Sequence, residues 1–281
     1  MKAFPIKCAD VSGILSTLLL AVVTASGPVA ACTVPDRAAA AVDIYPTAEE
    51  LPANLLRIYV YFPQPMQPTG ILEHIALLDA RGVEVPGVFL SNRYDLWSPD
   101  RRRLTVLFDP GRVKTGLVAH DALGRALEPG SRYSLVVRGS AVDARGCQLG
   151  TETEHAFTAR EADIDPPRAE EWALTRPAAG TVEPFEVDLG SPHDHVSLAY
   201  RLRIATADGD VVPGRIDLGH GEEVWSFTPN APWTSGTYVL HVDARLEDLA
   251  GNRPGLLFDR PTTAAVEPAV LERAWTPLQN N

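Results

Sequence analysis

The chain has 281 residues, of which 45% are hydrophobic, so it is long enough for one large domain or two modest ones with packed cores. Its formal net charge of −11 at pH 7 gives it no electrostatic attraction to a phosphate backbone, which argues against a nucleic-acid partner. The 24 prolines and 21 glycines favour many short strands joined by turns over long helices.

Residues 1–31 are predicted to be a signal peptide. Lys2 and Lys7 precede the stretch ILSTLLLAVVTASGPVAAC, in which an apolar run is followed by small residues, as in a bacterial secretory signal. The run is short and interrupted by Ser, Thr and Gly, and no later segment approaches the length of a membrane span. We therefore expect an extracytoplasmic protein whose mature chain is not transmembrane.

The end of the signal leaves two fates open for Cys32. The residues VAAC, 29–32, resemble the bacterial lipobox, in which the cysteine becomes the lipidated N-terminus, but they also fit ordinary cleavage to a soluble protein. Once Cys8 leaves with the signal, Cys32 and Cys147 remain, an even pair suited to an oxidising compartment. Lipidation of Cys32, the favoured interpretation, makes Cys147 a lone thiol with no chemistry of its own and allows membrane contact only through the anchor. Without lipidation, a Cys32–Cys147 disulfide becomes possible.

The chain repeats itself at a fixed spacing. The segment that begins IYVYFPQP aligns without a gap with the segment that begins FEVDLGSP, at an offset of 127 positions. In both copies apolar residues alternate with other residues, which is the period of a half-buried strand. We therefore expect strands at about 56–62 and 184–189, with Val60 and Val187 as equivalent core residues.

A second set of matches lies at an offset of 105 positions: Tyr133 matches Tyr238, and Asp143 matches Asp248. Each tyrosine is expected to form a tyrosine corner, with its hydroxyl bonded to nearby backbone. Each aspartate is expected to cap a turn that is completed by a glycine three residues later. The two offsets differ by 22, which predicts an insertion of about that length at 108–130.

A self-similar unit of about 100 residues with short alternating strands predicts an all-β fold of two tandem Ig-like β-sandwich modules after the signal segment. The tail contains one apolar stretch, AVLERAW, for which a short helix and disorder are both left open. The predicted organisation is a signal peptide at 1–31, a tether at 32–42, module 1 at 43–160 with the insertion at 108–130, a linker at 161–168, module 2 at 169–266 and a C-terminal tail at 267–281.

Two phrases resemble a known family. FPQPM at 62–66 follows the first strand, and DLAGN at 248–252 lies near the end of module 2; both resemble the bacterial Ig-like domain of the surface-layer (SbsA) type. The resemblance covers most of 43–160 and, more weakly, 165–262, and Cys147 stands where the family has an asparagine. It implies an Ig-like fold and a cell-surface setting, and it implies no catalytic residues.

The insertion holds the candidate partner-binding residues. Arg112, Lys114, His120 and Arg125 form a local basic element in an acidic chain, suited to a carboxylate, phosphate or sugar-acid partner. The alternative is structural: the segment forms a short helix that caps an open end of the sandwich.

His193 and His195 are the other candidates. Two histidines at i and i+2 share a face of a strand and could begin a metal site. The sequence offers no third ligand motif nearby, so a solvated loop without metal is the expected structure.

The usual catalytic signatures, GxSxG, HExxH, a Walker loop and GxGxxG after a strand, do not occur. We therefore predict a non-catalytic envelope or secreted protein that needs no cofactor and binds or spaces a protein or polysaccharide of the cell envelope. The alternative is a secreted carbohydrate- or metal-binding protein, or an enzyme accessory subunit, that uses the insertion at 108–130 or the His193/His195 stretch.

Overall fold

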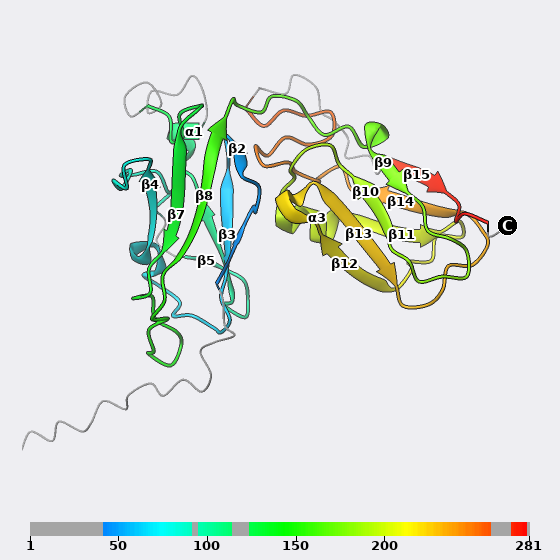
Figure 1. Cartoon of the computed structure of the whole chain (residues 1–281), viewed down its shortest axis with the longest axis horizontal. Helices are drawn as coiled ribbons and strands as arrows, with labels where there is room; N and C mark the ends of the chain where they lie inside the picture. The colour runs from blue at the N-terminus through cyan, green and yellow to red at the C-terminus, as the bar shows by residue number, and fades with distance from the viewer. Residues whose placement is uncertain (1–41, 92–94, 114–123, 260–270, 280–281) are drawn as a thin grey trace, which may run out of the picture. The chain divides into compact units, whose positions relative to one another are not determined.

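The computed structural model describes residues 42–91, 95–113, 124–259 and 271–279. The predicted signal peptide, Cys32, Lys114 and His120 lie outside these ranges. Residues 38–281 form one compact unit. Its fold is all-β, with two Ig-like β-sandwiches in succession along the chain (Figure 1). No helix within the described ranges is long and apolar enough to cross a membrane.

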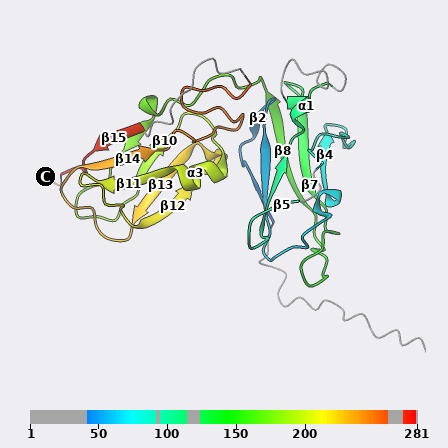
Figure 2. The same ribbon diagram turned by 180° about the vertical axis from the view of Figure 1, so that it is seen from behind.

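The described residues of the first sandwich form eight strands and two short helical segments: β1 (Asp43–Tyr45), β2 (Glu50–Pro52), β3 (Arg57–Tyr61), η2 (Ile71–His74), β4 (Ile75–Asp79), β5 (Leu96–Trp97), β6 (Arg103–Leu107), α1 (Pro110–Val113), β7 (Arg132–Val137) and β8 (Thr153–Arg160). One sheet has the order β1-β3-β6-β5 and the other the order β2-β8-β7-β4. Figure 2 shows β7 and β8 side by side from behind. Only β2 and β8 pair in parallel; the other pairs in this sandwich are antiparallel.

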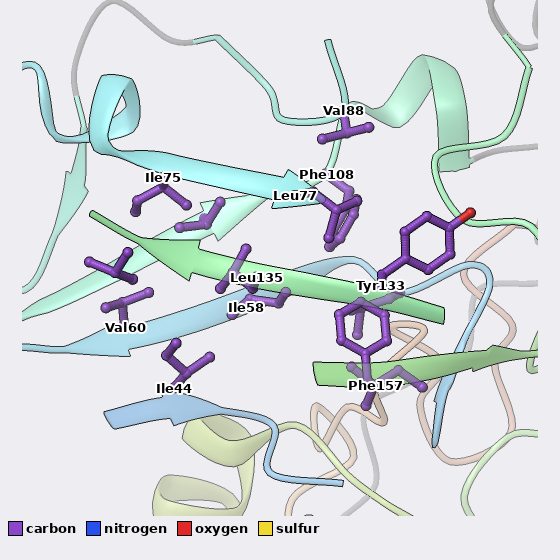
Figure 3. Packing of buried hydrophobic residues seen from close by; sticks show 14 of the residues in the cluster. Ile44, Ile58, Val60, Ile75, Leu77, Val88, Phe108, Tyr133, Leu135 and Phe157 are labelled. Atoms are coloured by element: carbon purple, nitrogen blue, oxygen red, sulfur yellow. The ribbon is translucent and has the colours of Figure 1, made fainter. Parts of the chain in front are cut away.

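The two sheets of the first sandwich meet in one hydrophobic cluster (Figure 3). Successive side chains of a strand point to opposite faces, so Ile58 and Val60 of β3 both point inward, where they are fully buried. Leu77 of β4 and Leu135 of β7 enter the same cluster from the other sheet. Full burial of one such side chain stabilises the fold by roughly 1.5–3 kcal/mol. The apolar residues that alternate in the sequence are therefore the ones whose burial between the two sheets stabilises the sandwich.

In the second sandwich, the part of the chain that the structure describes forms seven strands and three short helical segments: η3 (Ala169–Glu171), β9 (Ala173–Thr175), β10 (Phe185–Asp188), α3 (His195–Arg201), β11 (Leu202–Thr206), β12 (Gly214–Leu218), η4 (His220–Glu222), β13 (Val224–Pro229), β14 (Tyr238–Val242) and β15 (Leu271–Trp275). Its sheets have the orders β12-β13-β10-β9 and β11-β14-β15. The strands predicted at about 56–62 and 184–189 are β3 and β10. Val60 and Val187 are both fully buried in them, which confirms their prediction as core residues.

The strand pairing repeats with the sequence. In the first sandwich Ile75 of β4 pairs with Val137 of β7, and in the second Leu202 of β11 pairs with Val242 of β14. These partners are related by the same offsets, 127 and 105, that align the sequence. The repeat in the sequence is therefore a repeat in hydrogen-bond register.

The register corrects the position of the extra residues in the first module. Val60 pairs with Leu104, and Val187 pairs with Trp225, so β6 and β13 are related by an offset of 121. The offset thus falls from 127 to 121 before β6, and from 121 to 105 between β6 and β7. Sixteen of the 22 extra residues lie in the connection that contains 108–130, and six lie before β6. The prediction that all of them fall within 108–130 is wrong.

The predicted C-terminal tail contains the last strand of the second sandwich. The stretch left open between helix and disorder forms β15, which pairs antiparallel with β14. Tyr238 pairs with Trp275 just as Tyr133 pairs with Phe157, so β15 is the counterpart of β8. It lies at an offset of 118, which means that the second module has thirteen more residues before its last strand than the first. That longer connection hid the strand from the sequence comparison.

Both tyrosine corners are confirmed. The hydroxyl of Tyr133 accepts a hydrogen bond from the backbone N–H of Glu128 at 2.9 Å. The hydroxyl of Tyr238 accepts one from the backbone N–H of Thr234 at 3.1 Å. Each corner therefore ties the loop that precedes a central strand to that strand.

Both Asp-x-x-Gly turns are confirmed as well. Asp143 accepts the backbone N–H groups two and four residues later at 2.8 and 2.9 Å. Asp248 accepts the corresponding groups, also at 2.8 and 2.9 Å. Gly146 and Gly251 adopt positive φ angles of 85° and 78°, which L side chains rarely do.

Candidate functional site

The outer face of β3 is where the two sandwiches contact each other. Since Ile58 and Val60 point into the core, the alternating residues Arg57, Tyr59 and Tyr61 point the other way. Tyr59 is nevertheless only 4% exposed, because residues of the second sandwich cover it. We call this contact region the joint.

Asp194 is the central polar residue of the joint. It is the N-cap of α3, where its Oδ1 accepts the backbone N–H of Ser197 at 2.7 Å. Its Oδ2 accepts the hydroxyl of Tyr59 at 2.9 Å and lies 3.2 Å from Nε of Arg57. Burial raises the pKa of Asp194, and the Arg57 charge opposes that rise. One carboxylate thus caps a helix of one sandwich and binds two side chains of the other.

Glu247 extends this network. It forms an ion pair with Arg57 across the joint, and within its own sandwich its Oε1 accepts Nε of Arg253 at 3.0 Å. Arg57 is therefore held between two carboxylates of the second sandwich. Burial would lower the pKa of Arg57, but the charges of Asp194 and Glu247 raise it, so the guanidinium stays protonated.

A second buried carboxylate, Glu222, holds the N-terminal side of the joint. Its Oε2 accepts the backbone N–H of Thr47 at 2.7 Å, and its Oε1 lies 3.3 Å from Nδ1 of His195. The His195 ring in turn stacks on Tyr45 with 3.7 Å between ring centroids. Glu222 is 1% exposed and has a φ of 55°, so the backbone adopts an uncommon conformation where it presents this carboxylate.

The Asp-x-x-Gly turn of the second sandwich supplies the apolar part of the joint. Leu249 is 4% exposed and belongs to the hydrophobic cluster of the first sandwich. Its carbonyl accepts the backbone N–H of Leu56 at 3.1 Å. A Cβ added at Gly251 would lie 2.2 Å from Cδ1 of Leu56. The equivalent of Leu249 in the first sandwich is Ala144, which is exposed.

His193 occupies a core position. Asp248 forms a β-bridge with His193, and Asp143 forms the equivalent bridge with Met66, so His193 takes the place that Met66 has in the first sandwich. It is 1% exposed, and burial lowers its pKa to about 4. The ring is therefore neutral. The expectation of a solvated loop at HDH is wrong, because His193 is buried and His195 begins α3 within the joint.

The two histidines of the HDH stretch have separate structural surroundings. In the ranges that the structure describes, no three His, Cys, Asp or Glu side chains are arranged to hold a metal ion. His193 and His195 do not share a strand face, since α3 begins at His195. Each of the two histidines therefore has a structural role: His193 is a core residue, and His195 is the first residue of α3.

A groove of about 660 Å³ lies beside the joint. The linker, β2, the end of β8 and the loop before α3 line it, with seven carboxylates and two arginines. Asp248 is in its wall, and burial raises the pKa of this carboxyl to about 7. In the equivalent Asp143, hydrogen bonds from Cys147 N–H and the Arg145 side chain outweigh burial and lower the pKa. The second turn has Ala250 in place of that arginine.

In the described part of the insertion, the Arg112 side chain forms hydrogen bonds to nearby backbone carbonyls. Arg112 is 9% exposed, and its guanidinium donates to the carbonyls of Pro86, Gly124 and Arg125 at 2.8, 3.3 and 2.8 Å. Arg112 and Arg125 both line a small cavity of about 150 Å³. Lys114 and His120 lie outside the described residues, so the structure brings together two of the four predicted residues.

Cys147 is disulfide-bonded. Its partner lies outside the described residues, as do Cys8 and Cys32, the other two cysteines of the chain. The lone thiol expected at Cys147 under the anchor interpretation is therefore not what the structure has.

No family model matches the chain, and no curated protein matches it significantly. Its likenesses are to solved structures. Domains MG0-NIE-MG1 of native alpha-2-macroglobulin from Escherichia coli are 12% identical with a TM-score of 0.26, over 88% of this chain and 72% of that one. The titin domains z1z2 in complex with telethonin are 15% identical with a TM-score of 0.22, over 80% and 88%. The Ig1-2 module of the Drosophila receptor protein tyrosine phosphatase DLAR is 13% identical with a TM-score of 0.23, over 72% and 90%. Such values carry no functional argument, and the fold rests on the strand pairing above.

Sequence reasoning missed the joint, although a signal was present. Tyr59 and Tyr61 are large aromatic residues on the outer face of a strand, where the second copy has Glu186 and Asp188. An outer face that is aromatic in one copy and acidic in the other indicates that only the first is covered.

Proposed function

We propose that the chain is a non-catalytic extracytoplasmic protein whose two Ig-like modules form a binding or spacer element of fixed geometry. The joint is the observation that carries this proposal. It combines the apolar contact of Leu249 with two buried carboxylates, Asp194 and Glu222, each bonded to the first sandwich. Buried carboxylates at the contact need partners in fixed positions, which two modules that moved independently would not supply.

The geometry of these charges supports a single docked arrangement. A buried carboxylate is costly unless its partners are in place, and removing one partner typically costs about 3–5 kcal/mol. Asp194 and Glu222 therefore penalise any other docked orientation that keeps these carboxylates buried but away from their partners. Pro166 and Pro167 in the linker further restrict the chain between them.

The polar residues that the sequence offered for chemistry support a structural role. Arg112 is bound to backbone carbonyls, His193 replaces a core methionine, and the two corner tyrosines bond to backbone. Each of these side chains therefore contributes to the stability of the fold.

The extracytoplasmic setting is supported by the predicted signal and by the disulfide at Cys147, since disulfides persist in oxidising compartments. Because Cys8 would leave with the signal, we propose Cys32 as the partner of Cys147, in a soluble protein without a lipid anchor. The resemblance to surface-layer (SbsA) Ig-like domains supports a protein or polysaccharide of the cell envelope as the partner.

Small-angle X-ray scattering on the mature chain tests the fixed geometry. We expect one conformation to fit the wild-type scattering. Leu249→Lys places a charge in the apolar part of the joint, so its scattering should require an ensemble of module orientations.

Ala144→Lys is the matched control, because it makes the same substitution in the same turn of the other module, where the residue is exposed. It should scatter like the wild type. A wild-type protein that already needs an ensemble, or a Leu249→Lys variant that does not, would contradict the proposal.

A further inference from the structure

The groove beside the joint has a large excess of negative charge. Its seven carboxylates and two arginines leave five more acidic than basic groups in its lining. Part of the charge is neutralised locally: Arg160 pairs with Asp163 at 2.9 Å, and Arg168 pairs with Asp165 at 3.2 Å. Arg168 also lies 3.5 Å from Glu171, and the raised pKa of Asp248 leaves that carboxyl only partly ionised near neutral pH. The excess negative charge therefore remains mainly on Glu50, Asp188 and Glu223.

Three of those carboxylates are exposed and available. Glu50, Asp188 and Glu223 line the groove from β2, from β10 and from the segment before β13. None of them makes an ion pair with any residue that the structure describes. They come from both sandwiches, so the joint is what brings them around one groove.

These carboxylates do not suit a single metal ion. A metal needs several ligand atoms at about 2–2.6 Å from one point. No group of three such side chains within the described ranges meets that requirement. A ligand that carries its positive charges some distance apart fits the arrangement better.

His193 gives an independent indication of a ligand. Its Nδ1 lies 2.8 Å from the carbonyl oxygen of Ser191, so Nδ1 carries the proton and donates it. Nε2 then has a lone pair, and it is buried without a hydrogen-bond partner among the described residues. His193 is part of the groove lining. A buried acceptor without a donor is uncommon in a folded protein, and a bound N–H would satisfy it.

We propose that the groove binds a peptide segment that carries lysine or arginine side chains. Its cationic groups pair with Glu50, Asp188 and Glu223, and one N–H of the segment donates to Nε2 of His193. The inference rests on the proposed function as a binding element, and it gives that function a partner class: a basic segment of another protein.

Fluorescence anisotropy with a labelled hexalysine peptide at low salt tests this proposal. We expect saturable binding that weakens as salt rises, since salt screens exposed charge pairs. Glu50→Gln, Asp188→Asn and Glu223→Gln in one chain should weaken binding about tenfold or more, because each exposed ion pair contributes modestly. His193→Met, which restores the residue of the equivalent position, should weaken it about threefold by removing one uncharged hydrogen bond.

The matched control changes three exposed carboxylates outside the groove, by Glu152→Gln, Glu154→Gln and Asp208→Asn. It alters the net charge equally, so it should bind hexalysine like the wild type. Equal loss in both triple variants, no saturable binding, or unchanged affinity in His193→Met would overturn the inference. If hexalysine fails to bind while scattering still fits one conformation, the groove assignment fails and the proposed function stands.

Discussion

Asp194→Ala should both destabilise the protein and uncouple its modules. The change removes the N-cap of α3, which costs about 0.5–2 kcal/mol, and leaves the buried hydroxyl of Tyr59 without its acceptor, which costs about 1–3 kcal/mol. Arg57 keeps Glu247 as a partner, so the charge is not left alone. Since burial raises the pKa of Asp194, removing the carboxylate also recovers some desolvation energy. We expect a net loss of about 2–3 kcal/mol.

Equilibrium denaturation followed by two signals measures this loss and its location. Four of the five tryptophans, at 172, 225, 233 and 275, belong to the second sandwich, so fluorescence reports mainly that module. Far-UV circular dichroism reports both modules. The two signals should coincide for the wild type, where the joint couples the modules, and separate for Asp194→Ala.

Asp79→Ala is the control for this experiment. Asp79 also accepts two backbone N–H groups and pairs with an arginine, but it is the last residue of β4, and its partners among the described residues all belong to the first sandwich. Because the contacts of Asp79 are exposed and screened by solvent, this variant should lose clearly less stability than Asp194→Ala, with the two signals still coincident. If Asp194→Ala stays within about 0.5 kcal/mol of the wild type, the buried network does not stabilise the joint as argued.

Three further outcomes are expected. The intact mass of the mature protein should be lower than that of its reduced form by two hydrogen atoms and show no acyl group; an acyl increment would restore the anchor, and Cys147→Ser should lower stability by up to about 4–5 kcal/mol. His193→Met should stabilise the protein more at pH 5 than at pH 8: the folded pKa of about 4 is below the ordinary value of 6.5, so the wild type loses stability as pH falls through this window. A pH-independent difference would contradict the burial of a neutral His193. Tyr238→Phe should cost about 1 kcal/mol in thermal unfolding by removing the corner bond, and a neutral effect would argue against that role.

The fold could be predicted from the sequence because its signals are local and occur twice. The alternation around Val60 and Val187 has the period of a strand, and the Asp and Gly residues of the Asp-x-x-Gly turns predict the turn conformation directly. The last strand was missed because thirteen additional residues precede it in the second copy, which breaks the repeat that had aligned the earlier strands. A fixed offset detects strands only while the connecting loops keep their length.

The site could not be predicted in the same way, because the joint depends on which outer faces meet. His193 and His195 were considered as a pair of metal ligands, but His193 fills a core position. His195 lies beside Glu222 of its own sandwich and stacks on Tyr45 across the joint. Their roles depend on residues that are distant in the sequence: His193 forms a β-bridge with Asp248, and His195 stacks on Tyr45 of the other module. The sequence contained the residues of the joint and the groove, but no local pattern that brings them together.

The two copies of the Asp-x-x-Gly turn should diverge under different constraints among relatives of this protein. In the turn at 143–147 Ala144 is exposed, and Arg145 bonds to Asp143 and Gln64 of the same sandwich, so substitutions there act within one module. The turn at 248–252 has to close its own hairpin and also fit the first sandwich, where Leu249 enters the core and Gly251 lies against Leu56. Any drift at the second turn therefore requires a compensating change in another module. The second copy of the turn therefore couples the sequences of the two halves of the chain, whereas the first copy does not.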